Sequence, residues 1–140
     1  MKKVEFVEII AFISIVGGSS RMFSRGFFWS KEQETILHDS PFYVALHEIM
    51  PIWIWGIIVM AFSLILMSSA FFIPSQKLNN KCNWLLVVGG LGCAILYFLM
   101  TSASIYHAIN WLSTAQFAIS TVVCGLLAFV GGADIYDRRK

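Results

Sequence analysis

The segment PIWIWGIIVMAFSLILMSSAFFI, residues 51–73, contains no charged side chain. A helix rises about 1.5 Å per residue, so about 20 apolar residues cross the roughly 30 Å hydrocarbon core of a bilayer. Trp53 and Trp55 stand near its start and Pro74 follows its end. Aromatic residues anchor helices at membrane interfaces and proline stops them. The segment therefore predicts a membrane-spanning helix.

The composition of the whole chain agrees with this interpretation. Of 140 residues, 58% are hydrophobic and 13% are charged, and the mean hydropathy is +0.74. Soluble domains are about 45–50% apolar and about 25% charged, so this chain cannot cover a water-soluble surface. A soluble enzyme and a disulfide-stapled secreted domain are disfavoured. The net charge of +2 gives no field for a polyanion, so we expect no nucleic-acid partner.

Two more apolar runs follow, residues 84–105 and 111–132, because only His107 can titrate between Lys81 and Asp134. The helix that contains residues 51–73 is expected to start earlier. Asp39 or Ser40 would be its N-cap, Pro41 its first residue and Pro51 a kink.

The N-terminal segment is ambiguous, because only residues 9–20 are free of charge, which is too short for a span. A cleaved signal peptide or an interfacial segment is one interpretation, although Glu5 and Glu8 disfavour the signal peptide. The preferred alternative is a longer amphipathic helix, since helical spacing places small and cationic residues on one stripe. This polar stripe consists of Ser14, Gly18, Arg21 and Arg25.

The expected fold is thus an all-α integral membrane protein with one domain, residues 1–140. Four transmembrane helices, at about 4–28, 41–73, 84–105 and 111–132, form a bundle whose first helix is amphipathic. Seven basic residues share one side of the membrane in this topology: Lys2, Lys3, Lys77, Lys81, Arg138, Arg139 and Lys140. Both termini are therefore expected in the cytoplasm, with a bacterial inner membrane as the setting.

The last helix carries small residues at alternating steps of four and three. Such residues let helix backbones approach closely in lipid. This helix-packing seam consists of Thr114, Ala118, Thr121, Gly125, Ala128 and Gly132. Any polytopic bundle needs seams of this kind, but this one also fits a contact between copies. In the tail, Asp134 and Arg138 stand four residues apart and predict a local ion pair.

The arginines of the first helix are the most informative residues, since a charge within a bilayer is costly. Snorkelling to lipid phosphates would explain Arg21 and Arg25 without any function. The functional alternative is that Arg21 pairs with Glu48 or Asp39 and closes a polar pocket.

A group of titratable residues is expected together on the outer side of the membrane: His38, Asp39, His47, Glu48 and His107. Histidine and carboxylate groups serve in metal sites and in proton transfer, but no metal-ligand spacing is present. We therefore expect no metal and no cofactor. The cysteines, Cys82, Cys93 and Cys124, form no CxxC pair and are interpreted as small hydrophobic residues.

In layout the chain resembles the small holins and accessory membrane proteins of phages and bacteria, being short, multi-span and basic at its tail. The likeness is one of architecture and carries no residue roles. We expect a non-enzymatic protein that acts by homo-oligomeric assembly in lipid and forms a pore or permeabilises the membrane. Two alternatives stay open: an accessory subunit of a larger membrane complex, and a small redox or lipid enzyme that uses the outer His/Glu group.

Overall fold

The computed structural model describes residues 6–107 and 110–140, apart from the side chain of Asp39. These ranges contain helices and no strand. The helices are α1 (Phe6–Lys31), α2 (Gln33–Asp39), α3 (Pro41–Ile49), α4 (Ile52–Ala70), the short 3₁₀ helix η1 (Ile73–Ser75), α5 (Lys81–Tyr106) and α6 (Trp111–Asp137). Among them α1, α4, α5 and α6 are long and apolar enough to cross a membrane, as expected.

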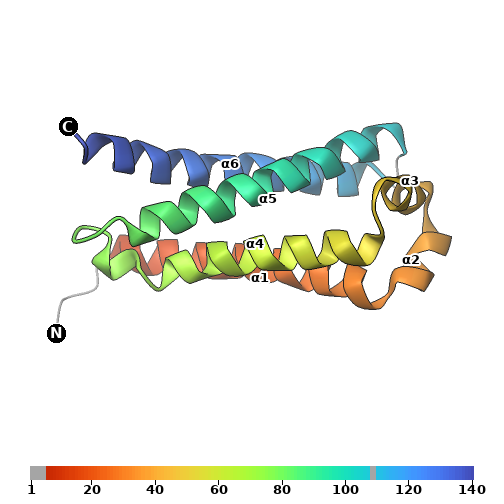
Figure 1. Ribbon diagram of the computed structural model, residues 1–140, viewed down its shortest axis with the longest axis horizontal. Helices are drawn as coiled ribbons and strands as arrows, with labels where there is room; N and C mark the ends of the chain where they lie inside the picture. Colours follow the sequence, from red (N-terminus) through yellow and green to blue (C-terminus); the bar gives the residue numbers. More distant parts are fainter. Residues whose placement is uncertain (1–5, 108–109) are drawn as a thin grey trace.

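The expected helix 41–73 is broken in two, which corrects the prediction of a kink at Pro51. Met50 and Pro51 are both extended, with ψ angles of 140° and 135°. Proline lacks an N–H and disfavours helical backbone in the residue before it, so α3 ends at this point. Figure 1 shows α3 end-on, across one end of the long helices. Of the two predicted N-cap candidates, Asp39 and Ser40, the structure uses Ser40, because its side chain accepts a hydrogen bond from the Phe42 N–H.

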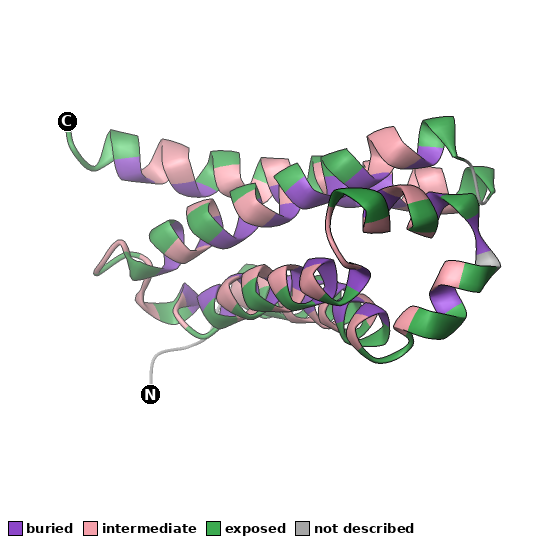
Figure 2. Ribbon diagram, turned by 45° about the vertical axis from the view of Figure 1, so that its right-hand side comes forward, coloured by how far each residue is buried: buried purple, intermediate pink, exposed green. Residues whose placement is uncertain are grey.

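The long helices pack in chain order. The extensive contacts are α1 with α4, α4 with α5, and α5 with α6, so α1 and α6 are the two edges of the arrangement. The start of α1 and the end of α6 lie at the same end of the molecule, and α2 and α3 cover the opposite end (Figure 1). Figure 2 shows that the buried sides of the long helices face one another.

Glycines bring the backbones together at these crossings. A Cβ atom on Gly26 of α1 would lie 2.7 Å from the carbonyl oxygen of Gly56 in α4. In the same way, a Cβ atom on Gly56 would collide with the carbonyl oxygen of Gly26. Gly89 faces α4 and Gly90 faces α6 at similarly short distances. Close approach at small residues is how apolar helices gain packing energy in lipid.

A polar network joins the ends of α5 and α6 near the C-terminus. The buried Asn83 side chain donates to Asp134 and accepts from Gln76 Nε2 at 2.8 Å. Asp134 also accepts from Arg138 Nε at 2.8 Å, which confirms the predicted local ion pair. These contacts close the bundle at the end opposite α3.

Candidate functional site

Two arginines of α1 reach across to α6. Arg21 Nη2 donates to Ser120 Oγ at 2.8 Å, and Arg25 Nη2 donates to Gln116 Oε1 at 3.3 Å. Both pairs are one helical turn apart, and the two helices run antiparallel, so the bonds form consecutive rungs. They connect the two edges of the arrangement, which have few backbone contacts of their own.

Tyr97 of α5 completes the site from behind. Its side chain is only 3% exposed. Together with Arg21, Arg25, Gln116 and Ser120, Tyr97 lines a small cavity of about 10 Å³. We call these five residues the arginine site. Its groups come from α1, α5 and α6, and only tertiary packing unites them.

Aromatic rings cover the arginine site on the side of α3. The guanidinium carbon of Arg25 lies 4.8 Å from the centre of the Phe117 ring, a cation–π distance. Phe42 of α3 is fully buried and stacks on Phe117 with ring centres 5.7 Å apart. The break at Pro51 lets α3 lie across this end, and it therefore shields the arginines from that end of the molecule.

A sulfur-rich layer adjoins the site in the bundle core. Cys124 Sγ lies 3.7 Å from Met22 Sδ, and both side chains are buried. All three cysteines are buried free thiols, as the sequence interpretation supposed. The hydroxyl of Ser19 has no hydrogen-bond partner among the described residues.

The predicted pairing of Arg21 with Glu48 does not occur in the structure. Among the described residues, no carboxylate forms an ion pair with Arg21 or Arg25. Glu48 is exposed on α3, since the break at Pro51 separates this helix from α4 and turns it across the end. The alternative partner, the side chain of Asp39, lies outside the described residues.

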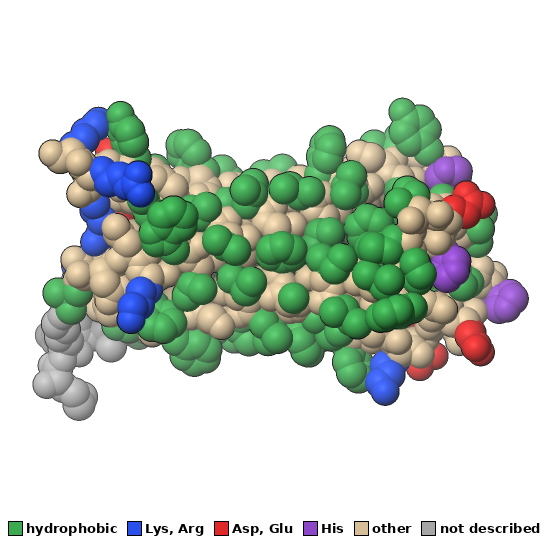
Figure 3. Space-filling view, in the orientation of Figure 1, with side chains coloured by type: hydrophobic (Ala, Val, Ile, Leu, Met, Phe, Trp, Pro, Cys, Tyr) green, Lys and Arg blue, Asp and Glu red, His purple; other side chains and the backbone are tan. Residues whose placement is uncertain are grey.

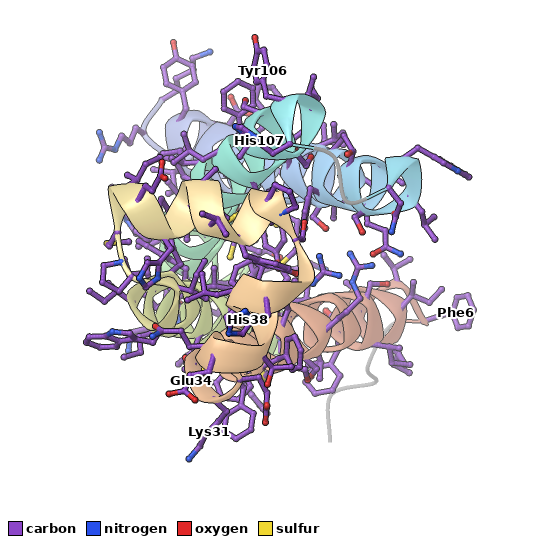
Figure 4. All side chains as sticks on the ribbon, turned by 90° about the vertical axis from the view of Figure 1, so that its right-hand side faces the viewer. Phe6, Lys31, Glu34, His38, Tyr106 and His107 are labelled. Atoms are coloured by element: carbon purple, nitrogen blue, oxygen red, sulfur yellow. The ribbon has the colours of Figure 1, made fainter. Side chains whose placement is uncertain are left out.

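The outer titratable group comes together only in part. His38, Glu48 and His107 line an open cavity of about 490 Å³ between α2, α3 and the end of α5. Figure 4 shows His38 and His107 at the same end of the molecule. His47 is used elsewhere, because its Nδ1 accepts from the Ile52 N–H at 3.4 Å at the start of α4. No three His, Cys, Asp or Glu residues in the described ranges are arranged to hold a metal.

The polar stripe of α1 lies largely on the surface. Ser14, Gly18 and Arg21 are exposed and Arg25 is half-buried. The surface around the glycine is open, because a Cβ on Gly18 would meet no atom within 4 Å.

The predicted helix-packing seam of α6 is half-buried at each of its six positions. The buried face is offset from the seam by one residue toward the N-terminus, and consists of Phe117, Ser120, Cys124, Gly131 and Ile135. A Cβ on Gly125 would meet no atom within 4 Å, so this residue makes no tight packing contact in its own chain.

Sequence reasoning missed Gln116 and Ser120 as partners of the arginines. A signal existed, because their spacing of four residues matches that of Arg21 and Arg25. The spacing could not identify which helix faces α1, and several other serines and threonines show similar periodicity.

Over the residues that the structure describes, these observations define an all-helical fold with four membrane-length helices and an arginine site between the first and the last of them. No protein-family model, curated protein or solved structure matches the chain. Its function must therefore be inferred from its own geometry.

Proposed function

We propose that α1, α4, α5 and α6 cross a lipid bilayer. On the face of the molecule that Figure 3 shows, the side chains between the two ends are largely apolar. Along α5, the exposed aromatic residues Trp84 and Tyr106 are about 33 Å apart at the helical rise, which matches a hydrocarbon core of about 30 Å. Exposed Trp111 and Tyr136 mark the two ends of α6 in the same way. Aromatic side chains at two levels are typical of membrane interfaces.

The charges support an orientation with both termini in the cytoplasm. Figure 3 shows Lys and Arg side chains gathered at the end where the chain terminates, and the acidic and histidine side chains mostly at the other. The basic end carries Lys77, Lys81, Arg138, Arg139 and Lys140, all exposed. At the opposite end Lys31 stands among acidic residues. Basic residues near helix ends favour the cytoplasmic side.

Within the bilayer, the protein acts by assembling with copies of itself around a polar path. The observation that carries this proposal is the exposure of Ser14, Gly18 and Arg21 on a membrane-length helix. A charged side chain deep in lipid costs about 2.5–3.5 kcal/mol, so a face that carries one favours water or protein over lipid. A ring of copies places this stripe toward a central water-filled path.

The edge of α6 supplies the contact between neighbouring copies. Gly125 and Gly132 have open space around them, with at most the Val87 side chain at 3.9 Å from a Cβ built on Gly132. Small residues with unused space allow a second helix to approach closely. The α1 and α6 edges thus provide a polar and a small-residue surface that one chain does not cover.

The test uses Gly125→Leu. A Cβ at this position would meet no atom of its own chain within 4 Å, so we expect the fold to persist while the leucine blocks the approach of a neighbouring helix. We expect wild-type protein to form a discrete oligomer by native mass spectrometry and to release a small dye from liposomes. Gly125→Leu should reduce both by at least about tenfold, which corresponds to about 1.4 kcal/mol of interface energy.

Ala61→Leu is the matched control, because Ala61 is exposed on α4, away from both edges. This variant should assemble and release dye as wild type does. A wild-type chain that stays monomeric and leaves liposomes sealed would contradict the proposal. Equal assembly of Gly125→Leu and Ala61→Leu would show that the α6 edge is not the interface.

A further inference from the structure

The arginine site holds two positive charges without a negative partner in the described part of the chain. The guanidinium groups of Arg21 and Arg25 donate to a hydroxyl and to an amide oxygen, both neutral. Each guanidinium has five N–H donors, so several remain for another acceptor. The site can therefore offer further N–H donors to an anion.

Tyr97 points to the place where that anion would sit. Its side chain is 97% buried and lines the small cavity beside the arginines. The electrostatic neighbours of this hydroxyl include both Arg25 and Arg21. A tyrosine O–H can donate a hydrogen bond, so Tyr97 is suited to contribute a donor to a species bound in this cavity.

The size of the cavity limits the anion. A cavity of about 10 Å³ admits one small species. A monatomic anion fits such a space, whereas a whole phosphate or sulfate group does not. The donor set, two guanidinium groups and a hydroxyl, suits a single anionic atom that accepts from several directions.

We propose that the arginine site binds one small inorganic anion, of the size and charge of chloride, between Arg21, Arg25 and the Tyr97 hydroxyl. The anion neutralises part of the charge that α1 carries and ties the α1 and α6 edges together. Every group in the site belongs to one chain, so the proposal goes beyond self-assembly and holds for a monomer.

The experiment measures thermal unfolding of the full-length protein in a maltoside detergent, which contains no phosphate. Chloride is titrated against gluconate, which is too large for the cavity, at constant ionic strength. A ligand that binds the folded state raises the unfolding midpoint, and at 100 times its Kd it increases the folded-to-unfolded ratio about 100-fold. We expect a saturable rise with chloride and with bromide.

Tyr97→Phe removes only the hydroxyl and should weaken the apparent chloride affinity by about tenfold, the effect of one lost hydrogen bond to a charged group. Tyr136→Phe removes an exposed hydroxyl from the other end of α6 and should respond as wild type. If Tyr97→Phe does not accumulate, the wild-type protein is assayed by ³⁵Cl magnetic resonance. Chloride bound to the protein should broaden the ³⁵Cl line, and bromide, which competes for the same site, should remove this broadening.

Three results would overturn the inference. The unfolding midpoint of the wild type could be equal in chloride and gluconate, with no excess ³⁵Cl line broadening, which means that water alone occupies the cavity. Tyr97→Phe could keep the full chloride response, which places the anion elsewhere. Finally, phosphatidylglycerol added to the micelles could abolish the chloride response and itself stabilise the wild type but not Tyr97→Phe. This result would identify a lipid phosphate oxygen as the occupant of the site.

Discussion

Arg25 is held by two different kinds of contact with α6. Its guanidinium donates to Gln116 Oε1 and lies over the ring of Phe117. The first contact needs a donor at the end of a long side chain, and the second uses the flat, weakly hydrated face of the group. Lysine is a compact, strongly hydrated cation that meets these needs poorly. Positive charge alone therefore does not define this position.

Arg25→Lys is expected to lower the free energy of unfolding by about 1–2 kcal/mol, through the combined loss of a charge-assisted hydrogen bond and a cation–π contact. Unfolding by denaturant in mixed micelles measures the change. Arg139→Lys is the control, because Arg139 is exposed at the C-terminal end. Equal stability of the two variants would show that Arg25 serves only as a positive charge near the membrane surface.

At the scale of the helices, glycines have opposite roles in the same element. Gly26 of α1 touches the backbone of α4, whereas Gly17 of α1 faces open space. The first position needs the absence of a side chain for packing. The second has no such need, and a glycine in a helix interior is destabilising by about 0.5–1 kcal/mol relative to alanine. The same substitution should therefore have opposite signs at the two sites.

Gly26→Ala is expected to lower the free energy of unfolding by about 1–3 kcal/mol, since its Cβ would force α1 away from the carbonyl oxygen of Gly56. Gly17→Ala should leave stability unchanged or raise it by up to about 1 kcal/mol. Thermal unfolding of both variants in detergent measures the difference. Destabilisation of similar size at both positions would mean that α1 does not cross α4 at Gly26.

At the scale of the whole molecule, charge is divided between the ends. The basic end carries the chain terminus, and the other end is covered by α2 and α3 with their acidic and histidine side chains (Figure 3). The described part of the chain has four membrane-length helices, and this even number returns the end of α6 to the side on which α1 begins. The orientation of the protein in the membrane can therefore be measured with one reactive residue placed at each end of the molecule.

The expected orientation is tested by introducing Lys31→Cys or Lys77→Cys and labelling intact cells with a membrane-impermeant maleimide. The cysteine at position 31 should react from outside, and the one at position 77 should react only after the cells are opened. The native cysteines are at most 1% exposed, so they should contribute little background. Labelling of position 77 from outside would reverse the proposed topology.

Features determined by neighbouring residues could be predicted from the sequence. The apolar runs predicted the number of membrane-length helices, because hydrophobicity and length are properties of a single segment. The sequence also predicts the Asp134–Arg138 pair and an N-cap at Asp39 or Ser40, since each depends on residues within one helical turn, and the structure uses Ser40 as the cap. Pro51 was recognised as a disturbance of the helix. Its effect on direction was underestimated, because the angle between two helices depends on what each packs against.

The arginine site was decided by tertiary structure. Arg21 and Ser120 are 99 residues apart in the chain, and the local sequence pattern of neither helix indicates which other helix it packs against. The opposite charges of Glu48 and Arg21 suggested that these side chains form an ion pair, but charge alone does not indicate how far apart two residues lie in the fold. The buried face of α6 likewise lies one residue from the predicted seam, since small residues recur on several faces of this helix. Local hydrophobicity thus determined which segments become helices, and backbone packing at the glycine crossings decided how each helix is rotated and which polar side chains meet.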